Sequence, residues 1–157
     1  MYTKNKKGFT LVEIMIVVAI IALLATIAIP GIIRARVTAN ESNAIATLKS
    51  IATGAETFRA AQTAAIYPAN LADLGAATPP YVSGFPGVVA VKAGYTFVVT
   101  GDGDEFDATA TPTATTSGQR AFCVDQRGDV WGTATGTIVY GAVGNGADCA
   151  VGAIITQ

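Results

Sequence analysis

One carboxylate stands in a long apolar run near the start of this chain. Between Phe9 and Ile29 the only charged side chain is Glu13. A charge in hydrocarbon costs about 2.5–3.5 kcal/mol on insertion scales, so an ionisable residue at such a position is by default a functional one. The chemistry it offers is pairing with a cation. The alternative is that Glu13 lies near the membrane edge and extends its carboxylate to the lipid headgroups.

Two cysteines in the C-terminal third are the next candidates for chemistry. They are Cys123 and Cys149. In a domain beyond a membrane span, such a pair favours a disulfide formed in an oxidising compartment. The alternative is two reduced, buried thiols. A disulfide here would stabilise the fold by about 3 kcal/mol in the chain-entropy treatment.

Acidic side chains gather in the segment from Asp102 to Asp107. Oxygen ligands on a flexible turn are what calcium requires, and Asp102, Asp104 and Asp107 are the candidate ligands. The EF-hand spacing does not fit, because Phe106 stands where a third ligand would fall. We favour the alternative, a solvated hairpin turn in which Asp and Gly have their usual turn roles. We therefore predict no metal.

The remaining composition does not favour catalysis or nucleic-acid binding. The chain is 51% hydrophobic and 13% charged, and it has no histidine. Beyond Ser50 acidic residues outnumber basic ones, which argues against a phosphate-backbone partner because Lys and Arg supply that affinity. The acidic residues lie in turns without an obvious apolar pocket to shift their pKa values. We predict a protein that is not an enzyme, has no cofactor and binds no nucleic acid.

The apolar run that holds Glu13 predicts a membrane-spanning helix. Residues 9–29 would make about 31 Å of helix, enough to cross the hydrocarbon core. Lysines at positions 4, 6 and 7 precede it, which places the N-terminus in the cytoplasm. A secretory signal would be cut after the apolar stretch, where Thr26-Ile27-Ala28 is a poor site.

The helical pattern continues past the apolar run. Pro30-Gly31 ends the purely apolar part, and a kink or local melting is expected there. Apolar residues then recur at helical spacing along one face: Val37, Ala44, Leu48, Ile51, Ala55 and Phe58. This stripe predicts one helix from about Phe9 to about Gln62, whose second half needs a partner.

The rest of the chain reads as loops and short strands. Turn signals from Ala65 to Gly87 predict a loop. A period of two then predicts strands at Tyr95–Thr100, Phe106–Thr111, Gln119–Val124, Val130–Trp131 and Thr137–Tyr140. Short turns between strands imply an antiparallel meander, one face of which packs on the helix stripe. The predicted fold class is α+β.

The start of the chain carries a specific motif, Lys6-Lys7-Gly8-Phe9-Thr10-Leu11-Val12-Glu13. A short basic leader, a Gly-Phe pair and a glutamate opening a hydrophobic helix resemble the signal of type IV prepilins and type II secretion pseudopilins. The resemblance extends over about Lys6 to Arg36. It implies a pilin-like fold with a long N-terminal helix packed on a small antiparallel β-meander.

The resemblance also implies roles for residues of the motif. In that family a membrane-embedded peptidase cuts after the glycine and methylates the new amine. By resemblance the cut would follow Gly8, and Phe9 would become the N-methylated N-terminus. Glu13 would form a salt bridge with the Phe9 amine of a neighbouring subunit, and this bridge would fix the register between helices.

On this resemblance the chain divides into four parts. They are a cleaved leader (1–8), a transmembrane and filament-core half of the helix (9–33), an amphipathic half (34–64) and a globular head with a disulfide-tied C-terminal region (65–157). Before assembly the subunit would be a single-pass inner-membrane protein. Its partners would be the prepilin peptidase and the pilus assembly machinery.

We predict a structural subunit of an extracellular type IV pilus, a homo-oligomeric helical filament. One alternative is a pseudopilin of a type II secretion system. The cysteine pair favours the pilus, and so does the acidic turn, which does not match the calcium loop of major pseudopilins. Another alternative is a monomeric membrane-anchored binding protein, which would need neither cleavage after Gly8 nor Glu13.

Overall fold

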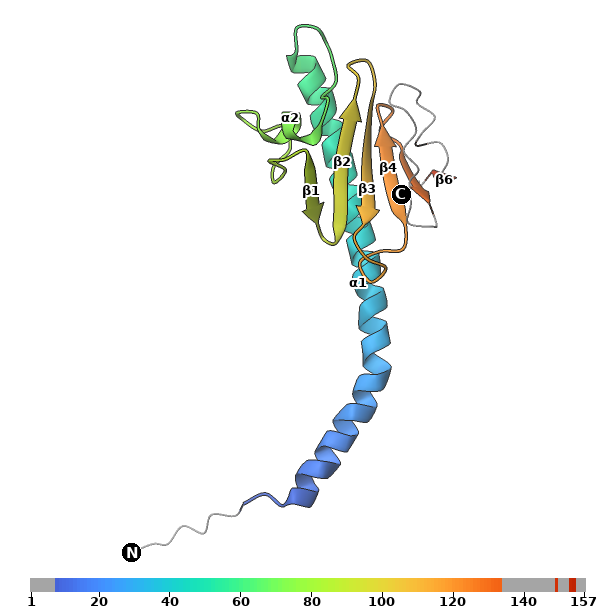
Figure 1. The fold of residues 1–157 in the computed structure, drawn as a ribbon. Coiled ribbons are helices and arrows are strands. Elements are labelled where there is room, and N and C mark those ends of the chain that lie inside the picture. The colour runs from blue at the N-terminus through green and yellow to red at the C-terminus, as the bar shows by residue number, and fades with distance from the viewer. Residues whose placement is uncertain (1–7, 134–148, 150–152, 155–157) are drawn as a thin grey trace, which may run out of the picture. The chain divides into compact units, whose positions relative to one another are not determined.

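In a computed structural model of this chain, residues 8–133, 149 and 153–154 are described. These residues form two helices and six strands: α1 (Leu11–Ala61), α2 (Leu71–Gly75), β1 (Val89–Lys92), β2 (Tyr95–Gly101), β3 (Phe106–Pro112), β4 (Ala121–Asp125), β5 (Val130–Thr133) and β6 (Ala153–Ile154) (Figure 1). The chain divides into two compact units, Met1–Ala35 and Arg36–Gln157, and each is described by itself below.

The long helix was predicted to within two residues at each end. Pro30 lies inside α1, which stays α-helical through Pro30 and Gly31. The local melting expected at these residues is therefore wrong, because one missing N–H donor does not interrupt a helix that is bonded on both sides. The kink itself stays a prediction.

The six strands form one antiparallel sheet in sequence order, β1 to β6. This meander confirms the predicted α+β fold class, and the strands predicted from Tyr95 to Trp131 are found within two residues of their expected bounds. β4 begins at Ala121 rather than Gln119, because the N–H groups of Gln119 and Arg120 donate to Glu41 of α1. The strand predicted at Thr137–Tyr140 lies outside the described residues.

One face of the sheet packs on the second half of α1 to form the main core of the unit from Arg36 onward. Within the predicted stripe, Ala44, Leu48, Ile51 and Ala55 are buried. The facing strands supply the large buried aromatic side chains: Tyr95, Phe97, Phe106 and Phe122. Along β2 buried residues alternate with half-buried ones, as expected for a strand with one face on a core.

Three elements were missed: α2, β1 and the two-residue strand β6. α2 falls in the segment predicted as a loop, and its Leu71 and Leu74 are fully buried in the main core. It is a single capped turn, too short for apolar periodicity to reveal it. β1 was also missed. It pairs with β2 through a tight turn in which Ala93 (φ 50°) and Gly94 (φ 76°) are left-handed, a geometry that suits a two-residue hairpin.

Candidate functional site

The predicted cleavage site lies ahead of the long helix. Gly8 and Phe9 are non-helical, and the Phe9 side chain is 86% exposed. A Cβ atom added at Gly8 would meet nothing within 4 Å. The packing of the chain therefore does not require glycine at position 8, and a requirement for it would come from a partner that binds this segment.

Glu13 is held by Thr10 in a capping box at the start of α1. The Thr10 backbone N–H and hydroxyl both donate to Glu13 Oε2, at 3.0 and 2.9 Å. In return the Glu13 N–H donates to the Thr10 hydroxyl at 3.3 Å. These bonds satisfy donors that a helix N-terminus otherwise leaves open. The single carboxylate of the apolar run thus has partners within its own chain.

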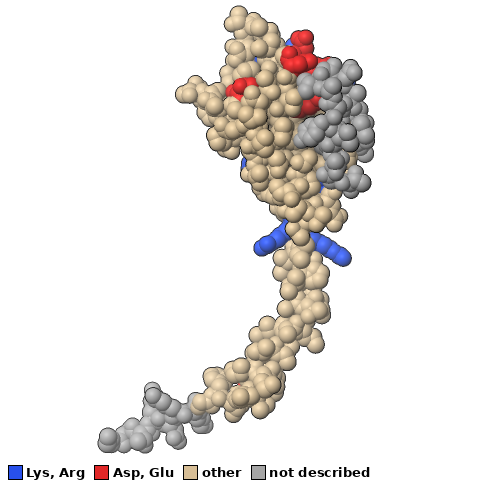
Figure 2. All heavy atoms as spheres, viewed as in Figure 1, with Lys and Arg blue, Asp and Glu red and all other residues tan. Residues whose placement is uncertain are grey.

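The apolar residues around Glu13 are exposed in the single chain. Figure 2 shows the N-terminal part of α1 almost without charged side chains. Large apolar side chains from Phe9 to Ile33 are 45–86% exposed. In its described part the structure has one helix that is long and apolar enough to cross a membrane, and that helix is α1. Burial of each such side chain is worth about 1.5–3 kcal/mol, so transfer of this surface out of water is favourable.

A second glutamate of α1 ties the head to the helix. Glu41 Oε1 accepts from the backbone N–H groups of Gln119 and Arg120 at 3.2 and 3.3 Å. Its Oε2 lies 3.0 Å from both Nε and Nη2 of Arg120. One residue earlier, the Asn40 amide donates to the Ser117 carbonyl at 2.9 Å. The loop between β3 and β4 is therefore fixed to α1 by a charged pair and backbone bonds.

Tyr95 lies beside this pair and is fully buried. Its hydroxyl donates to the Arg120 carbonyl at 2.9 Å. Burial, followed by the nearby Glu41 carboxylate, raises the pKa of Tyr95 to about 12, and Arg120 opposes both effects. An unfolded tyrosine releases its proton near pH 10. The folded state therefore loses stability as the pH rises from about 10 to about 12.

The loop after α1 is held by a second polar cluster. The Tyr67 hydroxyl donates to Glu56 Oε1 at 2.6 Å, and the Arg59 guanidinium lies 4.8 Å from the centre of the Tyr67 ring. The Tyr67 N–H donates to the Gly103 carbonyl at 2.8 Å. Burial, followed by Glu56, raises the pKa of Tyr67. These contacts place the β2–β3 turn beside the C-terminal end of α1.

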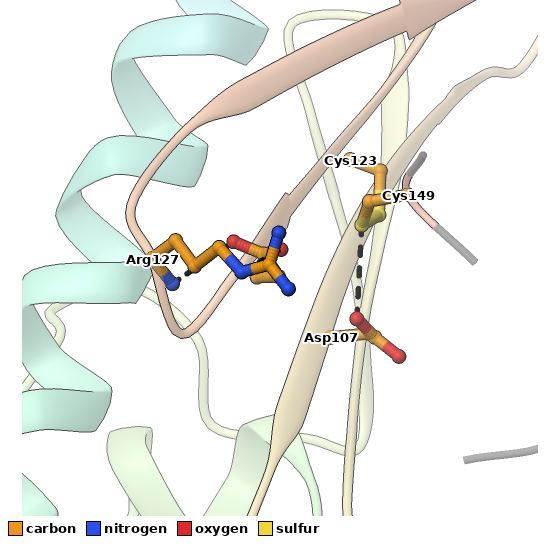
Figure 3. The surroundings of a disulfide bond; sticks show 5 residues. Asp107, Cys123, Arg127 and Cys149 are labelled. Carbon is orange, nitrogen blue, oxygen red and sulfur yellow. Dashed lines mark hydrogen bonds and ion pairs between the residues drawn. A yellow bond between two sulfur atoms is a disulfide. The ribbon is translucent and has the colours of Figure 1, made fainter. Parts of the chain in front are cut away.

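Cys123 and Cys149 are joined by a disulfide, with their Cα atoms 5.5 Å apart (Figure 3). Both are buried in a small cluster with Ala121, and Trp131 packs against it. Asp107 Oδ1 lies 3.7 Å from Cys149 Sγ. Because a disulfide sulfur carries no proton, this is a polar contact and not a hydrogen bond.

The acidic turn does not assemble a calcium ligand set. Asp102 Oδ1 accepts from the backbone N–H groups of Asp104 and Glu105, at 3.2 and 3.1 Å, as in an ordinary turn. In the described part of the chain, the candidate ligand atoms that lie within 4.8 Å of one another belong to Asp107, Cys123 and Cys149. The two sulfurs are bonded to each other in the disulfide and are not thiolate ligands, so this group is not a metal site either.

Sequence reasoning missed Thr10 and Glu41. The Thr10-x-x-Glu13 spacing is the capping-box pattern and could have been recognised from the sequence. Glu41 had no local signal, because its partners lie 78 and 79 residues further along the chain.

The N-terminal segment matches known proteins. Residues 3–29 match the family model described as the prokaryotic N-terminal methylation motif. Among curated proteins, the chain is 44% identical over 57 residues to the type IV major pilin protein PilA of Myxococcus xanthus. It is 54% identical over 39 residues to the type IV wide pilus major component PilA4 of Thermus thermophilus.

These matches cover part of each protein. They span 36% and 25% of this chain, and only 26% and 30% of the two relatives. No solved structure matches the chain. The motif and the two pilins nevertheless confirm the predicted resemblance to the type IV pilin family.

Proposed function

We propose that this chain is a structural subunit of a type IV pilus. The premise is that its N-terminal segment places it in the type IV pilin family. The observation that carries the proposal is the exposed apolar half of α1. Its apolar surface requires first a membrane and then copies of itself. A filament of many subunits provides the second environment.

The processing step would act on the exposed segment before α1. Hydrolysis of the Gly8–Phe9 peptide bond would release the leader with a carboxylate on Gly8 and leave a cationic amine on Phe9. Methylation of that amine would keep its charge. The exposure of Gly8 and Phe9, and their non-helical backbone, make this bond accessible to a peptidase.

Glu13 would change partners on assembly. In the single chain its carboxylate is held by Thr10. In the filament the new amine of Phe9 on a neighbouring subunit would add a charged partner in a water-poor helix bundle, where such pairing is worth most. Before assembly the chain would lie in the inner membrane as a single-pass protein with its N-terminus in the cytoplasm.

Mass spectrometry of purified filaments tests the processing. The subunit should begin at Phe9, carry one methyl group on its amine and lack Met1 to Gly8. Filaments built from subunits that keep the leader would contradict the proposal. A monomeric anchored protein would instead be found in the membrane fraction with residues 1–8 intact.

Gene deletion separates the pilus from the pseudopilus of a secretion system. We expect loss of surface filaments, seen by negative-stain microscopy, while protein secretion continues. The Cys123–Cys149 disulfide and the absence of a calcium ligand set at the described acidic turn favour the pilus. Loss of secreted enzymes with unchanged surface filaments would move the assignment to the pseudopilus.

A further inference from the structure

The carboxylate of Asp107 lies beside the disulfide, at a distance where a thiol would donate to it. Asp107 Oδ1 is 3.7 Å from Cys149 Sγ (Figure 3). In the described part of the chain, Asp107, Cys123 and Cys149 form one group whose oxygen and sulfur atoms all lie within 4.8 Å of one another. The disulfide has no proton to donate. The reduced Cys149 thiol has one, and an ionised carboxylate is a strong acceptor for it.

The register of the sheet places Asp107 on the same face as Cys123. Asp107 is opposite Asp125 across the β3–β4 pair, and Thr109 is opposite Cys123. Opposite residues share a face, and so do residues two apart along a strand. Ala108, between Asp107 and Thr109, belongs to the main core instead. The strand itself, and not a loop, therefore holds the carboxylate beside the cysteine pair.

Both sulfurs lie where a thiolate is disfavoured. Cys123 and Cys149 are each 3% exposed, in the small cluster with Ala121 and Trp131. Thiol–disulfide exchange proceeds through the thiolate, and apolar burial of a thiol opposes its ionisation. A buried cysteine pair therefore closes slowly unless a nearby base removes the thiol proton.

The charged groups around Asp107 come from its own strand end and from β4. Glu105 lies two residues before it in the chain, and Asp125 is its partner on β4. Arg127 is engaged with Asp125, through its backbone N–H at 2.9 Å and its Nε at 4.0 Å. On β2 the residue opposite Asp107 is the uncharged Thr100. The arginine of the β4–β5 turn is thus directed to the neighbouring carboxylate.

We propose that Asp107 is the general base that closes the Cys123–Cys149 bond during oxidative folding. An external disulfide first exchanges with the Cys123 thiol, which gives a mixed disulfide and one free external thiol. The Cys149 thiol then gives its proton to Asp107 Oδ1, and its sulfur attacks the Cys123 sulfur. The bond from Cys123 to the external sulfur breaks, and the departing thiolate takes the proton from Asp107. Two cysteine thiols are oxidised, and one external disulfide is reduced to two thiols.

Oxidation of the reduced full-length chain in detergent tests this role. Oxidised glutathione is the probe, and quenching by alkylation followed by mass spectrometry separates reduced chain, mixed disulfide and closed chain. In Asp107→Asn the mixed disulfide at Cys123 should accumulate and close at least about tenfold more slowly at neutral pH, because asparagine keeps the shape but accepts no proton. Asp107→Glu keeps a carboxylate and should close faster than Asp107→Asn. The matched control is Asp129→Asn, at an exposed acid in the β4–β5 turn, which should close as the wild type does.

The pH profile separates a base from a structural role. Closure of the wild type should change little from about pH 6 to about pH 8, whereas closure of Asp107→Asn should rise about tenfold per pH unit with its thiolate fraction. Thermal unfolding of the oxidised Asp107→Asn chain checks that this variant folds. Equal closure rates, parallel pH profiles or equal slowing in Asp129→Asn would overturn the proposal. None of these results bears on the proposed function, because a filament needs only the closed bond.

Discussion

The two halves of α1 are equally helical but differ in what covers them. From Leu11 to Ile33 the large apolar side chains are at least 45% exposed, whereas from Ala44 to Ala55 the buried stripe is at most 8% exposed. The second half finds its partner in the sheet of its own chain. The large apolar side chains of the first half are exposed in the single chain. One helix therefore serves two kinds of assembly, folding in its second half and association with lipid or other copies in its first.

Two glutamates of the helix, Glu13 and Glu41, repeat this difference. Glu13 is held by Thr10, three residues away, through bonds that any isolated helix start could make. Glu41 is held by Gln119 and Arg120, which only the folded head brings near. Loss of Glu13 should therefore affect association between chains, and loss of Glu41 should affect the fold of one chain.

Glu13→Val gives the largest expected effect. It raises the hydrophobicity of the span, so the chain should stay in the membrane with an unchanged head. Filament yield should nevertheless fall at least about tenfold, the effect of about 1.4 kcal/mol lost for each added subunit. Sheared filaments and membrane-bound subunit are quantified by immunoblot.

Glu13→Gln separates charge from capping in the same assay. Glutamine keeps an oxygen that can accept from Thr10 but cannot pair with an amine as an anion. We expect assembly to fall as with valine. Normal filaments in either variant would show that the register is set elsewhere.

Removal of the disulfide should affect the head and spare the first half of α1. Replacing both cysteines with serine should lower the free energy of unfolding of the head by about 3 kcal/mol, as expected for a closed loop of this length. Thermal unfolding of full-length chain in detergent, followed by near-ultraviolet circular dichroism, measures it. Ready alkylation of both thiols in unreduced native protein would contradict the bond.

The sequence predicted those parts of the fold that have local periodicity. The stripe at Leu48 and Ile51 and the alternation along Tyr95–Thr100 each repeat often enough to identify an element and its buried face. α2 and β1 were missed because one is a single turn and the other lies against proline- and glycine-rich loop signals. Asn70-x-x-Asp73 forms a capping box at α2, the same spacing that Thr10 and Glu13 show.

The N-terminal site was accessible from sequence for a different reason. Gly8, Phe9 and Glu13 lie within one short segment, so their spacing can be recognised in the sequence without knowledge of the fold. Other contacts join segments that lie far apart in the sequence, such as Glu41 with Arg120 and Asp107 with Cys149. Local sequence patterns do not encode such long-range contacts, and therefore the sequence analysis did not predict them.

Glu41→Ala should destabilise the head by about 2 kcal/mol, because it leaves an arginine and two backbone N–H groups, of which that of Arg120 is part-buried, without their acceptor. Glu41→Gln keeps one acceptor and should cost about half as much. Detergent-solubilised full-length chain and the same thermal assay apply. The matched comparison is Glu13→Gln, which should leave this unfolding transition in place. Equal shifts in both variants would remove the distinction between the two glutamates.

Thr10→Val should give the smallest effect, and it tests the local side of the comparison. Valine keeps the shape of threonine but removes the hydroxyl that donates to Glu13 Oε2 and accepts from the Glu13 N–H. Loss of a helix cap costs about 1 kcal/mol, so amide hydrogen exchange at residues 11–14 should accelerate about fivefold in micelles. The control is Thr26→Val, whose hydroxyl donates to the Ala22 carbonyl inside the helix and caps nothing. Head unfolding should not change in either variant. Unchanged exchange at residues 11–14 would show that Thr10 does not hold Glu13 in the single chain, and the change of partner proposed for assembly would then lose its starting point.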